Sequence, residues 1–343
     1  MKNWLKNLLL MMVVIIGMVI ILEFAAQFLI SKKLINPIIF GDSETYMFDA
    51  KLGWAIEPNT EGIHNSREFE YPIKNNSFGM RYKEFSKEKN TGTYRVAVLG
   101  DSFTWGFMEE SKRFTDKAEE FSKNKLEMLN FGVSGYGPIQ YYLMLDKIIQ
   151  YKPDMVLIAF YLGNDFLDNV FWNRYGCYKP YAKIDANGEL EITGYPLPNR
   201  FGSPGNPRTR LTEIEKNYYI AYRLRLLIGR FGNKTFDKIN QKGLLGLEEK
   251  DFYLKQSDNI ELINNAITIN ELLLKRIKEK LEMNNIKFAV LEIPSKNEYG
   301  YKSWERKPIR GWEKQPVRNN TAGVKDYRVH NALMTTLEKL NID

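Results

Sequence analysis

Cysteine and histidine are almost missing from this chain of 343 residues, which has one cysteine and two histidines. A single cysteine, Cys177, excludes an internal disulfide and a zinc site built on cysteines. Two histidines, His64 and His330, argue against a zinc site built on histidines, because such a site needs three or four protein ligands. We therefore expect no metal and no cofactor.

The chain also lacks a block of lysine and arginine with interleaved aromatic residues, although its net charge is +7. Such blocks are typical of nucleic-acid-binding proteins, so we do not expect a nucleic-acid partner. A basic chain still suits other anionic partners, such as a membrane surface or an acidic polysaccharide. With 44% hydrophobic and 13% aromatic residues, the chain has ample material for one large domain or two smaller ones. Nothing in the composition indicates an oligomeric state.

A long apolar segment opens the chain. An uninterrupted apolar run covers residues 8–22, resumes over 24–30 after Glu23, and is flanked by lysines on both sides. About 20 such residues span a bilayer as a helix. A cleaved signal peptide would have a shorter core and a small-residue cleavage site, and a soluble helix is rarely apolar all round. We predict an uncleaved signal anchor over residues 1–33, single-pass in the cytoplasmic membrane, with the rest of the chain outside the cytoplasm.

Residues 41–93 differ in composition from the residues on either side of them. They are rich in glycine and proline, and residues 67–73 alternate between polar and apolar as a strand does. We expect a small β-rich lead-in that packs on the main domain. The main domain then covers residues 94–343, with an aperiodic insertion at 170–255 that contains some helix around 212–230.

Strands and helices alternate through the main domain. Apolar runs predict four strands, and helical periodicity predicts a helix after each of them. Such alternation implies an α/β fold with a parallel sheet and helices on both faces. The predicted strands are 95–99, 126–131, 155–161 and 287–293, and the predicted helices are 112–125, 138–150, 258–284 and 326–340.

Three of the strands end in polar or glycine-rich turns. These turns are Gly100-Asp-Ser102, Gly132-Val-Ser-Gly135 and Gly163-Asn-Asp165. In a parallel sheet all three lie at one edge, which is where open α/β sheets place their ligand sites. A serine at the first turn is a candidate nucleophile, and backbone N–H groups beside it can hold an oxyanion. An ordinary tight turn with a serine cap is the simpler alternative for the first turn alone.

The three turns together resemble the SGNH (GDSL-like) hydrolase family, over roughly residues 94–342. The resemblance implies a three-layer, flavodoxin-like α/β/α sandwich and ester hydrolysis or acyl transfer. It also implies that Ser102 is the nucleophile. The N–H groups of Ser102 and Gly135 and the side-chain amide of Asn164 would form the oxyanion hole. Neutral donors suit that role because acyl transfer builds negative charge on a carbonyl oxygen.

The lead-in resembles a subset of this family more loosely, through Leu52-Gly-Trp54, Pro58-Asn59 and Asn76-Ser-Phe-Gly-Met-Arg81. Members of that subset are membrane-anchored envelope proteins linked to acetylation or deacetylation of cell-surface polysaccharide. The resemblance therefore implies an ester on a cell-envelope polysaccharide as the substrate.

The sequence departs from the family at the catalytic base. The family uses a histidine three residues after an aspartate, on a loop after a fifth strand. His64 lies too early in the chain, and His330 follows Asp326 by four residues at the start of a helical pattern. We interpret His330 as a half-exposed helical residue and a weak substitute for the base. We also expect the chain to end before the loop that carries the Asp–His pair.

Two interpretations of this departure remain open. The chain is a fragment of a competent enzyme, which we favour, or it is a pseudo-enzyme. The corresponding functions are a membrane-anchored serine esterase or acyltransferase, and an inactive carbohydrate-binding or assembly protein that retains the fold.

Other residues near the turns have simpler structural roles. Asp101 is expected to form the turn, and Trp105 and Tyr136 suit packing as well as a substrate pocket. Asp165 and Asp168 are interpreted as helix-start acids and not as a metal pair. A basic loop at 295–325 is interpreted as solvated, although it could grip an anionic glycan; its cations are Lys302, Arg306, Lys307 and Arg310.

Overall fold

The computed structural model describes most of the main domain, the lead-in and the N-terminal helix. The basic loop with its four cations, and Asp326, lie outside the described residues. The described residues are 2–32, 34–35, 45–65, 70–123, 125–174, 177–197, 214, 217–224, 260–294 and 328–343.

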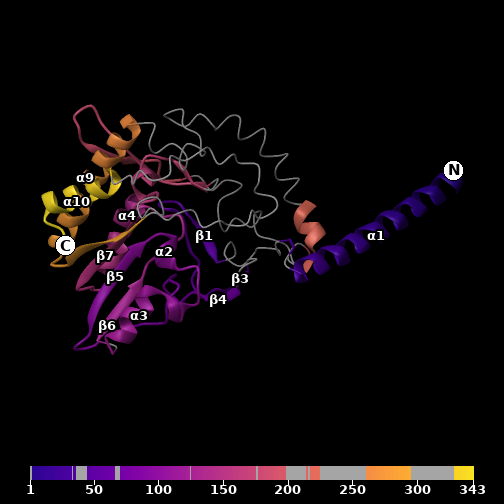
Figure 1. Ribbon diagram of the computed structural model, residues 1–343, viewed down its shortest axis with the longest axis horizontal. Helices are drawn as coiled ribbons and strands as arrows, with labels where there is room; N and C mark the ends of the chain where they lie inside the picture. The colour runs from indigo at the N-terminus through magenta and orange to yellow at the C-terminus, as the bar shows by residue number, and fades with distance from the viewer. Residues whose placement is uncertain are drawn as a thin grey trace, which may run out of the picture. The chain divides into compact units, whose positions relative to one another are not determined.

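Four parallel strands form the central sheet, in the order β12-β7-β5-β6 (Figure 1). If the four strands are numbered 1 to 4 along the chain, their order across the sheet is 4-3-1-2, which is the doubly wound order of flavodoxin-like sheets. The predicted strands are confirmed, and β7 and β12 have the predicted ends. The strands are β5 (Tyr94–Gly100), β6 (Leu126–Asn130), β7 (Met155–Tyr161) and β12 (Lys287–Ile293).

Helices connect these strands and cover both faces of the sheet. From β5 the chain moves outward to β6, then returns past β5 to β7 and on to β12. Because crossovers are right-handed, this reversal places α3 on one face and α4 and α9 on the other. The contacts agree, since α4 and α9 pack on each other and α3 packs on β6. The helices are α3 (Phe114–Phe121), α4 (Pro138–Ile149), α9 (Ile260–Glu282) and α10 (Arg328–Leu340).

Alternate residues of the central strand β5 supply the core on each face. Val96 and Val98 pack with Phe114 and Ala118 of α3. Ala97, between the two valines, faces the opposite side and is fully buried. A strand buried on both faces has no polar positions, which explains the continuous apolar run of β5.

Arg95 ties together the amino-terminal edge of the sheet. Its buried guanidinium donates hydrogen bonds to the carbonyl oxygens of Ser86, Lys87 and Tyr151, at 2.9, 2.8 and 2.6 Å. It also donates to the Glu127 carboxylate of β6 at 2.5 Å. One cation therefore joins the segment before β5, the start of β6 and the turn before β7.

Asp154 completes this edge. Its carboxylate accepts the Arg95 backbone N–H at 2.7 Å and the Lys89 ammonium at 2.5 Å. Burial works to raise the pKa of Asp154, but the Lys89 ammonium and the Arg95 N–H outweigh it and lower that pKa. Asp154 therefore stays ionised beside the cations that it holds.

Several short elements were not predicted. The single-turn helix α2 (Ser102–Trp105) follows β5. A second, α5 (Asp165–Asp168), follows β7, and the sequence predicted only the acids at its start. Two small antiparallel pairs lie within 170–197, where the sequence predicted an aperiodic insertion. Elements of two to four residues are too short for a period to show. The strands are β8 (Asn173–Arg174), β9 (Cys177–Tyr178), β10 (Tyr181–Ile184) and β11 (Leu190–Thr193).

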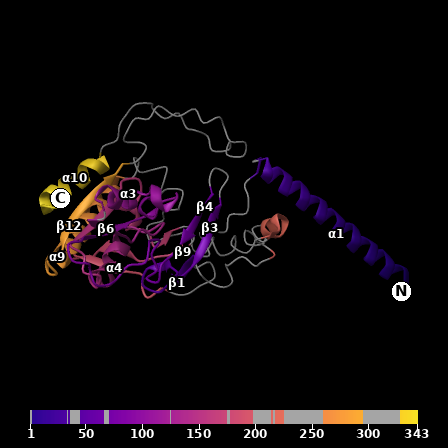
Figure 2. The same cartoon turned by 90° about the horizontal axis from the view of Figure 1, so that it is seen from below.

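The chain divides into two compact units, one of Glu84–Leu197 with Glu249–Asp343, and one of Met1–Lys83 with Pro198–Glu248. The second of these contains two antiparallel hairpins, which lie within the residues of the predicted lead-in (Figure 2). The predicted domain boundaries remain a prediction. The hairpin strands are β1 (Tyr46–Asp49), β2 (Gly53–Ile56), β3 (Glu61–Asn65) and β4 (Glu70–Lys74).

An apolar helix, α1 (Lys2–Ser31), begins the same unit and is long and apolar enough to cross a membrane over Trp4–Ser31. Glu23 interrupts its apolar surface. The two carboxylate oxygens of Glu23 accept the backbone N–H groups of Tyr219 and Ile220, each at 2.9 Å. A short helical segment at 219–224 is thereby held against α1 (Figures 1 and 2).

Replacing Arg95 with methionine should destabilise the main domain by about 3–5 kcal/mol, because Glu127 and three carbonyl groups lose a buried partner. Thermal unfolding of the full chain in mild detergent, followed by near-UV circular dichroism, measures the loss. Lys152→Met is the matched control, since Lys152 pairs with Glu88 at the exposed surface. Equal melting temperatures for the two variants would contradict the role given to Arg95.

Candidate active site

The first turn places Ser102 directly after the central strand. Asp101 caps α2, and its carboxylate accepts the Phe103 N–H at 2.8 Å, which confirms its role as a turn-forming residue. Ser102 is the first residue of α2 and is half-buried. A Cβ atom at Gly100 would lie 2.0 Å from Thr104 Oγ1, so the end of β5 requires glycine. Ser102 therefore stands at the carboxyl end of the sheet's central strand.

The second turn packs directly on α2. Asn130, the last residue of β6, donates through Nδ2 to the Thr104 carbonyl oxygen at 2.8 Å, and its Oδ1 accepts the Gly132 N–H at 2.9 Å. A Cβ atom at Gly132 would lie 2.3 Å from the backbone nitrogen of Trp105. The backbones of the first two turns thus meet without a side chain between them.

Gly135 lies in the left-handed region, with φ of 81°, a conformation that favours glycine. The Tyr136 N–H bonds back to the Val133 carbonyl oxygen at 3.1 Å and closes the turn. Tyr136 itself is almost fully buried, which fits its packing role. The predicted oxyanion donor therefore sits in a tight, buried loop.

The third turn places Asn164 at the start of α5. Asn164 is the residue that caps this helix, and only 6% of it is exposed. Its Nδ2 donates to the Asp168 Oδ2 four residues later. A Cβ atom at Gly163 would lie 2.4 Å from the Tyr161 ring, so the chain can leave β7 this way only with glycine at 163.

The three turns lie close together at the carboxyl edge of the sheet. The ring centroids of Phe103 and Tyr161 are 4.3 Å apart, which joins the first turn to the third. The Ile139 N–H donates to Asn169 Oδ1 at 2.9 Å, which joins the helix that follows the second turn to the end of the helix that follows the third. With the contact between Gly132 and Trp105, the three predicted turns and the helices that follow them pack together at this edge of the sheet.

Three buried carboxyl groups cluster at the same edge of the sheet. Asp101, Asp165 and Asp168 are all buried, and a Lys179 ammonium lies among them, 3.8 Å from Asp168 Oδ1. Burial raises the pKa of Asp165 well above its usual range; the carboxylates of Asp101 and Asp168 raise it further, while the Tyr161 N–H and Lys179 oppose them. Burial also raises the pKa of the Tyr141 hydroxyl, and the carboxylates of Asp165, Asp101 and Asp168 raise it further. Asp165 and Asp168 lie in the first turn of α5, as predicted. Their burial was not predicted.

The described residues contain no group of three or more histidine, cysteine or acidic side chains suited to a metal ion. Burial raises the pKa of the Cys177 thiol to about 11, so this cysteine is a weak nucleophile at neutral pH.

The two histidines lie on different elements. His64 is on β3 and stacks on Tyr71, with ring centroids 4.7 Å apart. His330 is half-exposed near the start of α10, as predicted, and its Nδ1 lies 2.6 Å from Glu292 Oε2 near the end of β12. Because β7 separates β12 from β5, these two strands are about 10 Å apart. The partnership with Glu292 was not predicted.

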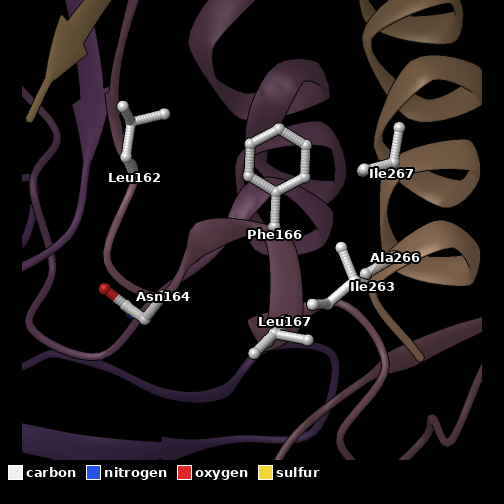
Figure 3. A pocket seen from close by; sticks show the side chains of 7 residues that line it. All are labelled: Leu162, Asn164, Phe166, Leu167, Ile263, Ala266 and Ile267. Atoms are coloured by element: carbon white, nitrogen blue, oxygen red, sulfur yellow. The ribbon is translucent and has the colours of Figure 1, made fainter. Parts of the chain in front are cut away.

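A small apolar pocket, about 20 Å³ in volume, lies between α5 and α9. Figure 3 shows Leu162 and Asn164 on one side of the pocket and the α9 side chains on the other. Its lining is Leu162, Asn164, Phe166, Leu167, Ile263, Ala266 and Ile267.

Comparison with known proteins gives little. No family model matches the chain, and no curated protein matches it. One similar solved structure is a GDSL-like lipase from Bacteroides thetaiotaomicron, with 13% identity. The similarity covers 74% of this chain and 90% of that chain, with a TM-score of 0.23. A similarity of this size supports no functional assignment.

Asn130→Ala should destabilise the main domain by about 2–4 kcal/mol, because the Thr104 carbonyl and the Gly132 N–H both lose a buried partner. The melting temperature of the full chain measures the effect. Asn284→Ala removes one exposed hydrogen bond at the end of α9 and serves as the control, with an expected change within about 0.5 kcal/mol. A loss no greater than that of the control would show that Asn130 does not join the first two turns.

Proposed function

We propose that this chain is an SGNH-type serine ester hydrolase or O-acyltransferase with Ser102 as its nucleophile. The observation that carries the proposal is the packing of three strand-end turns, with the helices that follow them, at one edge of the sheet. Each turn contributes one group of the required chemistry: a hydroxyl from Ser102, a backbone N–H from Gly135 and an amide from Asn164. Together these groups supply a nucleophile and an oxyanion hole, which a serine esterase needs in addition to a base.

In the proposed reaction, Ser102 Oγ attacks the carbonyl carbon of an ester while a base takes its proton. The carbonyl oxygen becomes an oxyanion, which the N–H groups of Ser102 and Gly135 and the Asn164 amide stabilise. The alcohol then leaves, and the acyl group stays on Ser102. Water completes a hydrolysis, whereas the hydroxyl group of a second sugar completes a transfer.

The proposed substrate is an ester on a cell-envelope polysaccharide. Two features support it: the membrane-length helix α1, and the match of the lead-in to envelope proteins of this family at Leu52-Gly-Trp54 and Pro58-Asn59. The net charge of +7 suits an anionic glycan or membrane surface.

A fluorophosphonate probe should label the full chain in detergent, and Ser102→Ala should abolish the labelling, because the probe reacts only with an activated serine hydroxyl. Ser134→Ala is the matched control, since Ser134 lies in the second turn and should leave the labelling intact. The labelled protein is detected by gel fluorescence, and folding is checked by circular dichroism.

A folded protein that takes no label would overturn the enzymatic proposal and leave the inactive carbohydrate-binding or assembly protein in its place. In the same assay, labelling of His330→Gln at the wild-type rate would exclude its imidazole as the base for Ser102.

The proposed location is the cytoplasmic membrane, with α1 as a single-pass anchor and the remainder outside the cytoplasm. Protease added to intact spheroplasts that express the chain should therefore degrade everything after α1, because the short N-terminal tail stays inside. Full protection until the membrane is opened would place the main domain in the cytoplasm instead.

A further inference from the structure

We propose that Asp168 and Lys179 are positioning residues for the Asn164 amide. This inference rests on the proposed role of Asn164 in the oxyanion hole. Asp168 holds the amide in one orientation, and Lys179 supplies the positive charge that lets a carboxylate do so next to a developing oxyanion.

Asn164 and Asp168 are joined twice. The Asn164 Nδ2 donates to Asp168 Oδ2, and the Asp168 backbone N–H donates to the Asn164 carbonyl oxygen at 2.8 Å. The Asp168 side chain is completely buried, and Asn164 is 6% exposed. Water therefore cannot easily replace either partner.

This bond decides which end of the amide is presented to a substrate. A side-chain amide has two Nδ2 hydrogens and one oxygen. Asp168 takes one hydrogen, and the other remains to donate to a carbonyl oxygen. Rotation of the amide by 180° would bring Asn164 Oδ1 against the carboxylate, and two acceptors repel each other. Asp168 thus keeps the donor end of Asn164 in place before the reaction begins, as preorganised stabilisation requires.

A carboxylate in this position creates an electrostatic problem that Lys179 solves. Negative charge next to an oxyanion raises the barrier to its formation, and a buried charge without a partner is costly. The fully buried Lys179 ammonium lies 3.8 Å from Asp168 Oδ1 and donates to the Asp168 carbonyl oxygen at 2.9 Å. The Asp168–Lys179 pair is therefore close to neutral, yet still offers Asn164 a strong acceptor.

The loop of the second turn packs against the same pair at Gly137. A Cβ atom at Gly137 would lie 2.8 Å from the Asp168 Cβ and 3.7 Å from the Lys179 Nζ. The loop that carries Gly135 therefore closes onto Asp168 with no side chain between them. One buried pair thus sets the position of the Asn164 amide and supports the loop that holds the second backbone donor.

Two double variants of the full chain test the inference. Asp168→Asn with Lys179→Met removes both charges but keeps an oxygen that can accept from Asn164. Asp168→Leu with Lys179→Met removes the same charges and also the acceptor. Lys179→Met also takes the cation away from the buried Asp165 and Asp101, but it does so in both variants. The comparison between the two variants therefore tests the acceptor at residue 168. Melting temperatures and circular dichroism establish that both fold.

The kinetic readout is hydrolysis of p-nitrophenyl acetate and the rate of Ser102 labelling by the fluorophosphonate. The leucine pair should lose about 10–100-fold in kcat with little change in KM, because the amide acts on the transition state. The asparagine pair should stay within a few-fold of the parent. In an Asn164→Ala background, the leucine pair should cause no further loss, since the amide that it positions is gone. Equal kcat values for the two pairs would overturn the inference while Ser102-dependent turnover, and with it the proposed function, still stands.

Absence of any Ser102-dependent turnover would instead overturn the proposed function. The hydrogen bond is then tested through thermal unfolding, where the Asn164→Ala and leucine-pair losses in melting temperature should be strongly non-additive. Additive losses would overturn the inference on that readout too.

Discussion

Parallel pairing of β5 with a strand on each side is the constraint on which the candidate site depends. Parallel strands share a direction, so the turns after β5, β6 and β7 must emerge at the same edge. Neighbouring strands are about 4.8 Å apart, which brings the three turns within reach of one small ligand. Arg95 and Asp154 link the strands at the opposite edge of the sheet, through bonds from Arg95 to Asp154 and to Glu127 of β6. These bonds fix the register of the strands and therefore the positions of the turns. The carboxyl edge carries glycines and short helices, whose backbones can approach closely.

Most of the sheet and its helices could be predicted because burial leaves a clear mark on the sequence. Strands β7 and β12 are nearly continuous apolar runs, and α9 keeps a helical period over its whole length. The short helices α2 and α5 left no such mark, and neither did the small strand pairs after residue 170. The Asp101 carboxylate caps α2, whereas Asn164 makes no side-chain cap bond to α5. Helices of four residues depend on such caps and on their neighbours, and not on any period of their own.

The candidate site could be predicted in part for a different reason. Ser102, Gly135 and Asn164 stand at fixed offsets from strand ends, and the topology brings their turns together. Asp168 offered a weak signal, since residues four apart on a helix are neighbours and an amide can reach a carboxylate there. Lys179 and Glu292 offered none. Their partners lie 11 and 38 residues away in the chain, and these residues come into contact only in the folded structure.

The two hydrogen bonds at Glu23 have a consequence for biosynthesis. The helix that carries Glu23 is among the first parts of the chain to leave the ribosome, yet its carboxylate meets Tyr219 and Ile220, 196 and 197 residues later. At about 5–20 residues per second, that interval is roughly 10–40 s. Until then, the donor that the helix itself offers to Glu23 is the Gln27 amide, which bonds to its Oε1 at 2.8 Å. The emerging helix therefore carries one donor for this carboxylate from the start, and the middle of the polypeptide adds two more when it has been made.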